Sequence, residues 1–138
     1  MKRPILEVHV NAILLAALIL GLFGLARAAD DKADPVGTWK CEYGIYGQKR
    51  TSILIIKQDG DKLAGTMSWT DQEGEPLKDV KLLGGTLTFD AKRVLMGQEF
   101  ANHYEVKIDG DRLMGKLTSS DSKGKTYDFD LEATREKK

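Results

Sequence analysis

The chain has few of the residues on which most enzymatic chemistry depends. Its 138 residues include one cysteine and two histidines, so an internal disulfide cannot form and no pair of histidines has metal-ligand spacing. A G-x-S-x-G nucleophile motif and a glycine-rich phosphate loop are also missing. We therefore expect a protein that is not an enzyme and that has neither a metal site nor a cofactor.

The chain also lacks an excess of charge of either sign. Lysine and arginine together number 21, as do aspartate and glutamate. Without residues 1–28 these counts become 18 and 20, which gives a formal charge of −2. Because a domain of this charge has no basic field to attract nucleic acid or an anionic membrane surface, we expect neither as a partner.

The N-terminal segment has a composition unlike that of the rest. Lys2 and Arg3 precede an apolar run over residues 12–26, and the run leads into Ala26-Arg27-Ala28. A basic start, an apolar run and an A-x-A pattern are together typical of a secretory signal peptide. The run is also shorter than the roughly 20 residues that a membrane-spanning helix needs. We predict a signal peptide over residues 1–28.

The predicted domain organisation follows from this segment. Residues 29–35 would be a linker, and residues 36–138 would form a single domain that is secreted or periplasmic. The alternative is that the apolar run is retained as an uncleaved anchor. In either case we expect no stable insertion of the mature domain into a membrane.

One phrase occurs twice in the chain. KQDGDKLAGTM covers residues 57–67, and KIDGDRLMGKL covers residues 107–117. An Asp-Gly pair flanked by alternating apolar residues is typical of a two-residue hairpin loop, so we expect the same hairpin twice, with Gly65 and Gly115 at bent or close-packed positions. With Asp59-Gly60 and Asp109-Gly110 as loops, the predicted partners are Ile56 and Leu63, Leu54 and Gly65, Val106 and Leu113, and Tyr104 and Gly115.

Turn signals divide the remaining chain into short segments rich in β-branched and aromatic residues, several of which alternate between apolar and polar. The predicted fold is an all-β, eight-stranded antiparallel up-and-down barrel, in which the first and last strands pair and no sheet edge is left. A two-sheet sandwich is the alternative. The predicted strands cover residues 36–43, 50–58, 62–70, 78–83, 86–94, 98–108, 112–119 and 125–135.

Two short motifs lie at the ends of the predicted domain. The first strand opens with Gly-Thr-Trp-Lys at residues 37–40, and the last ends with Ala-Thr-Arg, where Arg135 is in phase with the inward residues of its strand. This resembles the calycin superfamily, which includes lipocalins and avidins, and short β-rich domains of exported bacterial proteins. The resemblance implies that Arg135 stacks on Trp39 as a structural pair at the closed end of the barrel. It does not extend to biotin or to lipocalin ligands, because the later avidin tryptophans and the lipocalin T-D-Y motif are missing.

Strand parity predicts a lining that mixes apolar side chains with a few hydrogen-bonding groups, as small-molecule pockets do. An exported binding protein for a small, mostly apolar ligand is therefore one expected function. An exported structural or protein-interaction module with a solid core is the alternative. The apolar turn over residues 94–98 would form the lip of a pocket or a partner contact, or it would pack back on the barrel. Cys41 is expected to be buried and His103 to face solvent. The inward residues are Tyr43, Leu54, Met67, Trp69, Phe89, Asn102, Tyr104, Tyr127 and Phe129.

Overall fold

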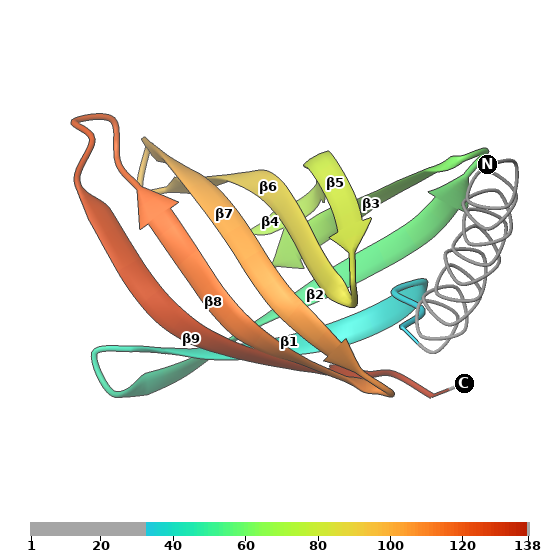
Figure 1. The fold of residues 1–138 in the computed structure, drawn as a ribbon. Helices are drawn as coiled ribbons and strands as arrows, with labels where there is room; N and C mark the ends of the chain where they lie inside the picture. Colours follow the sequence, from blue (N-terminus) through green and yellow to red (C-terminus); the bar gives the residue numbers. More distant parts are fainter. Residues whose placement is uncertain (1–32, 138) are drawn as a thin grey trace, which may run out of the picture. The chain divides into compact units, whose positions relative to one another are not determined.

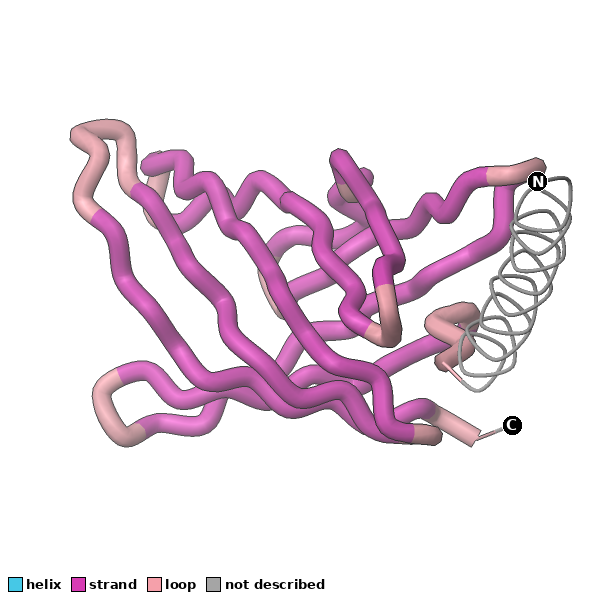
Figure 2. The backbone as a smooth tube through the Cα atoms, viewed as in Figure 1, coloured by secondary structure: helices cyan, strands magenta, loops and turns pink. Residues whose placement is uncertain are grey.

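The computed structural model describes residues 33–137, and the predicted signal peptide lies outside them. The described residues form antiparallel strands joined by short turns (Figures 1 and 2). The all-β prediction is confirmed. The strands are β1 (Gly37–Ile45), β2 (Gln48–Asp59), β3 (Lys62–Trp69), β4 (Gln72–Pro76), β5 (Lys78–Leu83), β6 (Thr86–Leu95), β7 (Gln98–Asp109), β8 (Arg112–Ser120) and β9 (Thr126–Arg135).

All nine strands of the described part belong to one sheet in the order β4-β3-β2-β1-β9-β8-β7-β6-β5. The predicted pairing of the first and last strands is confirmed, since Trp39 lies opposite Arg135 and Tyr43 opposite Leu131. The additional strand is β4, which lies between the predicted strands over residues 62–70 and 78–83. It pairs with the end of β3 across a register shift.

The sheet differs from the predicted barrel in closure as well as in strand number. Its two edges are β4 and β5, although a single residue, Leu77, separates these strands in the chain. Pro76 has no N–H to offer a neighbouring strand, Leu77 donates its N–H to the Gly65 carbonyl instead, and Asp79 has a positive φ of 53°. The chain changes direction at this point, so β4 and β5 do not pair.

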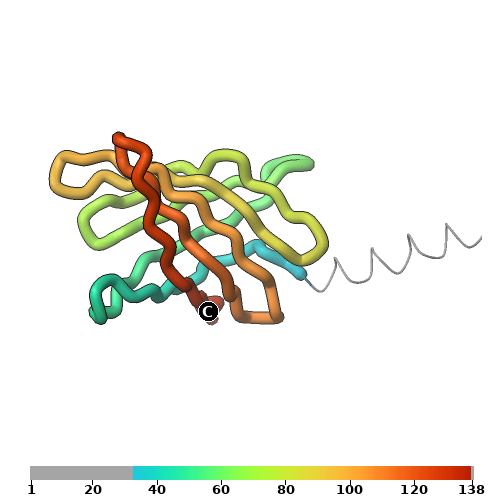
Figure 3. The backbone as a smooth tube through the Cα atoms, turned by 60° about the vertical axis from the view of Figure 1, so that its left-hand side comes forward, coloured from blue at the N-terminus to red at the C-terminus, as the bar shows by residue number. Residues whose placement is uncertain are grey.

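A glutamine side chain bridges the opening that results. The Gln72 Nε2 donates to the Lys92 carbonyl at 2.8 Å, and its Oε1 accepts from the Val94 N–H at 2.8 Å. The Gln72 side chain on β4 thus offers the backbone of β6 one donor and one acceptor, as the backbone of a neighbouring strand would. The view in Figure 3 shows how the curled sheet brings these two segments together.

The repeated phrase forms the same hairpin twice, but the predicted loops are wrong by one residue and the predicted partners therefore by two. The loops are Gly60-Asp61 and Gly110-Asp111. Both glycines have a φ of 61° and the following aspartates do not have a positive φ, the pattern of a type II′ turn, which takes glycine first. Because the shift in partners is even, every side chain keeps its predicted face. The observed partners are Ile56 and Gly65, Leu54 and Met67, Val106 and Gly115, and Tyr104 and Leu117.

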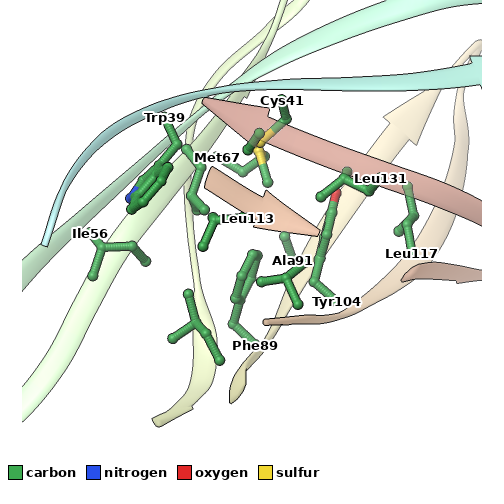
Figure 4. Packing of buried hydrophobic residues seen from close by; sticks show 14 of the residues in the cluster. Trp39, Cys41, Ile56, Met67, Phe89, Ala91, Tyr104, Leu113, Leu117 and Leu131 are labelled. Atoms are coloured by element: carbon green, nitrogen blue, oxygen red, sulfur yellow. The ribbon is translucent and has the colours of Figure 1, made fainter. Parts of the chain in front are cut away.

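The concave side of the sheet is filled over most of its length by large side chains (Figure 4). Phe89 and Tyr104 stack with ring centroids 4.6 Å apart. Leu54, Met67 and Trp39 are buried around them. The middle of the fold is thus a packed core with little room for a ligand.

Candidate ligand-binding site

One end of the curled sheet is closed by the predicted pair of Trp39 and Arg135. The Arg135 guanidinium carbon lies 4.2 Å from the centre of the Trp39 ring, a cation–π geometry. The indole N–H donates to the Pro35 carbonyl at 2.9 Å, and the Arg135 Nε donates to the Asp111 carboxylate at 2.9 Å. Arg135 therefore ties β9 to β1 and to the turn between β7 and β8.

The residues just before β1 also contact this closed end. Ala33 and Pro35 are buried, and Arg135 donates to the carbonyls of Asp34, at 2.7 Å, and of Val36. The described part of the predicted linker, residues 33–35, thus packs against the strands of the domain. Sequence patterning missed this because the segment has no strand periodicity and is held by side chains from the far end of the chain.

The opposite end holds a pocket of about 290 Å³. It lies where the β1–β2, β6–β7 and β8–β9 turns gather, at the left in Figure 1. The residues that line it come from six strands and one turn: Tyr43, Ile45, Tyr46, Trp69, Arg93, Leu95, Phe100, Asn102, Leu117, Ser119, Tyr127 and Phe129.

The nine residues predicted to line a cavity divide into two groups. Four belong to the packed core, each no more than 1 % exposed: Leu54, Met67, Phe89 and Tyr104. Five line the pocket: Tyr43, Trp69, Asn102, Tyr127 and Phe129. The difference is one of depth along the strands, because all nine point to the concave side.

Asn102 lies at the base of the pocket and is 5 % exposed. Its Nδ2 donates to the Tyr104 hydroxyl at 3.2 Å, whereas its Oδ1 is buried and has no hydrogen-bond partner within residues 33–137. Burial raises the pKa of Tyr104 above its ordinary value, so this hydroxyl stays protonated. Since the hydroxyl can donate or accept, either orientation of the amide leaves one of its polar atoms unpaired.

Arg93 is one of the pocket residues that strand parity could have found and did not. It is in phase with the inward Phe89 and Ala91 on β6, and its side chain is 12 % exposed. The guanidinium carbon lies 4.8 Å from the centre of the Trp69 ring, and Nη1 contacts the Asp71 carboxylate at 2.7 Å. That hydrogen bond holds the pKa of Asp71 below its ordinary value.

Tyr43 is the pocket tyrosine whose ionisation is clearly perturbed. Burial raises its pKa, and the positive charge of Arg93 offsets part of this effect. The phenol is therefore neutral at physiological pH. It offers the pocket a hydroxyl and not a charge.

Two hairpin loops beside the pocket carry large apolar residues at their tips. Tyr46 is 96 % exposed and Met96 is 97 % exposed. Their φ values are 51° and 52°, in the left-handed region that bulky residues rarely adopt. The turn over residues 94–98 therefore does not pack back on the sheet.

The remaining reactive side chains lie away from the pocket. Cys41 is buried in the core, and burial raises the pKa of its thiol to about 12, so the residue is unreactive in the folded state. His103 points outward, as expected, and its Nδ1 lies 2.5 Å from the Asp90 carboxylate. Between residues 33 and 137, no cluster of three or more histidine, cysteine or acidic side chains is placed to hold a metal ion.

Within the described part of the chain, no helix has the length and apolar character needed to cross a membrane. Comparisons of the chain with protein-family models, with curated proteins and with solved structures give no match.

Proposed function

We propose that the chain is an exported, calycin-like binding protein for a small, mostly apolar ligand. The ligand would occupy the pocket at the end of the curled sheet opposite Trp39 and Arg135. Support for export is the signal-like pattern that ends in Ala26-Arg27-Ala28. Support for the calycin-like arrangement is the stacked Trp39 and Arg135 pair at the other end.

The observation that carries this proposal is the unpaired amide of Asn102 beneath an apolar-lined pocket. Leaving a buried polar atom unpaired costs about 1–3 kcal/mol, and a ligand that supplies the missing hydrogen bond recovers it. The volume of about 290 Å³ lies just below the usual range for ligand pockets, about 300–1,000 Å³. A small ligand with one hydrogen-bonding group fits these features.

A second candidate function is an interaction module without a ligand. The packed middle of the sheet and the exposed tips of Tyr46 and Met96 favour it. In that case the pocket would be a shallow hollow between turns, and the loop tips would contact another protein.

Native mass spectrometry of the protein purified from its own host distinguishes the two functions. The binding protein should carry one extra mass per chain, released on denaturation. In parallel, the neutral dye N-phenyl-1-naphthylamine should bind the ligand-free protein with one-to-one stoichiometry.

A matched pair of variants on β8 locates the binding. Ser119 lines the pocket, whereas Ser120 is the next residue and faces the other side of the sheet. Ser119→Phe should abolish dye binding and Ser120→Phe should preserve it. A protein that carries no extra mass and binds no dye would favour the interaction module.

A further inference from the structure

The aromatic residues of the chain are concentrated at the pocket. The sequence has two tryptophans, four tyrosines and four phenylalanines, and all except Phe23 lie within residues 33–137. Six of these nine line the pocket, whereas the other three, Trp39, Phe89 and Tyr104, are in the core. Aromatic side chains stack best on other flat rings. The six are Tyr43, Tyr46, Trp69, Phe100, Tyr127 and Phe129.

The pocket has almost no net charge to offer. Among its lining residues Arg93 alone carries a charge in the part that the structure describes, and its Nη1 already contacts Asp71 at 2.7 Å and the Gln72 Oε1 at 3.2 Å. The charge of this guanidinium is thus already balanced by Asp71 for an anionic ligand. The electrostatics therefore favour a neutral ligand over a fatty acid or another carboxylate.

We expect the polar group of the ligand to lie at the deep end of the pocket. Asn102 is the pocket residue with an unpaired buried atom, and it lies directly above the Tyr104 hydroxyl, to which it is hydrogen-bonded. A hydroxyl, which both donates and accepts, can pair with this amide in either orientation. A purely hydrocarbon ligand would leave the amide unpaired.

Tyr46 stands at the outer end of the same pocket. It lines the pocket although it is 96 % exposed, and its φ of 51° is one that asparagine adopts more readily than a bulky residue. A tyrosine at this turn position is therefore less favourable for the fold than asparagine would be. A ring placed to cover the outer face of a bound flat molecule accounts for its presence.

We propose, building on the binding function above, that the ligand is a neutral planar aromatic molecule with a hydroxyl at one edge. The hydroxyl pairs with the amide of Asn102, the rings lie against the aromatic walls, and Tyr46 covers the outer end. The ligand class is thus inferred from the chemistry of the residues that line the pocket, and not from the volume of the pocket alone.

Isothermal titration calorimetry with four probes at neutral pH tests the class. The probes are 2-naphthol, its saturated analogue decahydro-2-naphthol, 2-methoxynaphthalene, which has no hydroxyl, and decanoate. We expect 2-naphthol to bind one-to-one and at least about tenfold more tightly than each of the other three, a difference of about 1.4 kcal/mol. This comparison uses the unaltered protein and does not depend on the folding of a variant.

Two variants locate the binding. Asn102→Leu should remove the preference for 2-naphthol over 2-methoxynaphthalene. Tyr46→Asn should raise the Tm and weaken 2-naphthol binding several-fold. Met96→Asn introduces asparagine at a matching exposed, positive-φ position in the β6–β7 turn, and it should raise the Tm and leave binding unchanged.

The outcomes separate this inference from the function on which it rests. If decanoate or decahydro-2-naphthol binds as tightly as 2-naphthol, and Ser119→Phe abolishes this binding, the aromatic ligand class is overturned and the binding function stands. Failure of every probe, together with no ligand on the protein from its host, would overturn both.

Discussion

Single residues at the closed end act through several contacts at once. Arg135 stacks on Trp39 and also donates to Asp111 and to carbonyl groups before β1. A lysine could supply the charge at this position, but it has no planar group to stack and fewer donors. The sequence motif predicted the pairing of Arg135 with Trp39, and the additional partners became known from the structure.

The first prediction concerns this pair. Trp39 is completely buried, so Trp39→Ala should lower the free energy of unfolding by about 3–5 kcal/mol, and Arg135→Ala should lower it by less. Because the two side chains are in contact, their losses should fail to add in a double-mutant cycle measured by urea unfolding. Additive losses would contradict the stacked pair.

Arg112→Ala is the matched control for Arg135→Ala. Arg112 is an exposed arginine whose Nη2 lies 3.6 Å from the Glu132 carboxylate. Exposed ion pairs contribute about 0–1 kcal/mol. Its loss should therefore be small and additive with Trp39→Ala.

At the scale of elements, the two repeated hairpins depend on glycine for a reason that the sequence only partly shows. A Cβ added at Gly65 would lie 2.0 Å from the Ile55 carbonyl oxygen, and one added at Gly115 would lie 2.0 Å from the Glu105 oxygen. The backbone of the partner strand occupies the space where a side chain would begin. The sequence predicted close packing at both positions. The register, however, was predicted from Asp-Gly loops, whereas glycine comes first in both turns.

The second prediction follows from these distances. Gly65→Ala and Gly115→Ala should each lower the free energy of unfolding by about 1–3 kcal/mol or more, because the backbone must move to admit a methyl group. Gly44→Ala is the control, since its Cβ would come no closer than 4.0 Å to another residue. That change should be neutral or stabilising by up to about 1 kcal/mol. Urea unfolding of the three variants checks the ranking, and equal effects at all three positions would contradict it.

At the scale of the whole described domain, the sheet is held together across its opening by a side chain and not by a strand pair. The Gln72 amide meets the backbone of β6 at Lys92 and Val94. The same glutamine also accepts from the Arg93 Nη1 at 3.2 Å, and Arg93 lines the pocket. The bridge across the opening thus contacts a residue of the pocket.

The third prediction tests this bridge. Gln72→Glu keeps the size of the side chain but removes the donor to the Lys92 carbonyl, so it should lower the free energy of unfolding by about 1–3 kcal/mol. The Val94 amide should also exchange its hydrogen faster. Gln98→Glu, at an exposed position at the start of β7, should leave both quantities nearly unchanged. Unaltered stability and exchange in Gln72→Glu would show that the bridge contributes nothing.

The sequence by itself determined eight of the nine strands of the described part, the approximate positions of the repeated hairpins and which side chains face the concave side. These features depend on the two-residue period of a strand and on local turn chemistry. The tertiary structure decided how deep each inward residue lies, which separates Phe129 at the pocket from Phe89 in the core. It also decided that the sheet opens at Leu77 and that the Asn102 amide is left with an unpaired atom. The reason is that depth and closure depend on the tilt and stagger of all the strands together, which no local pattern contains.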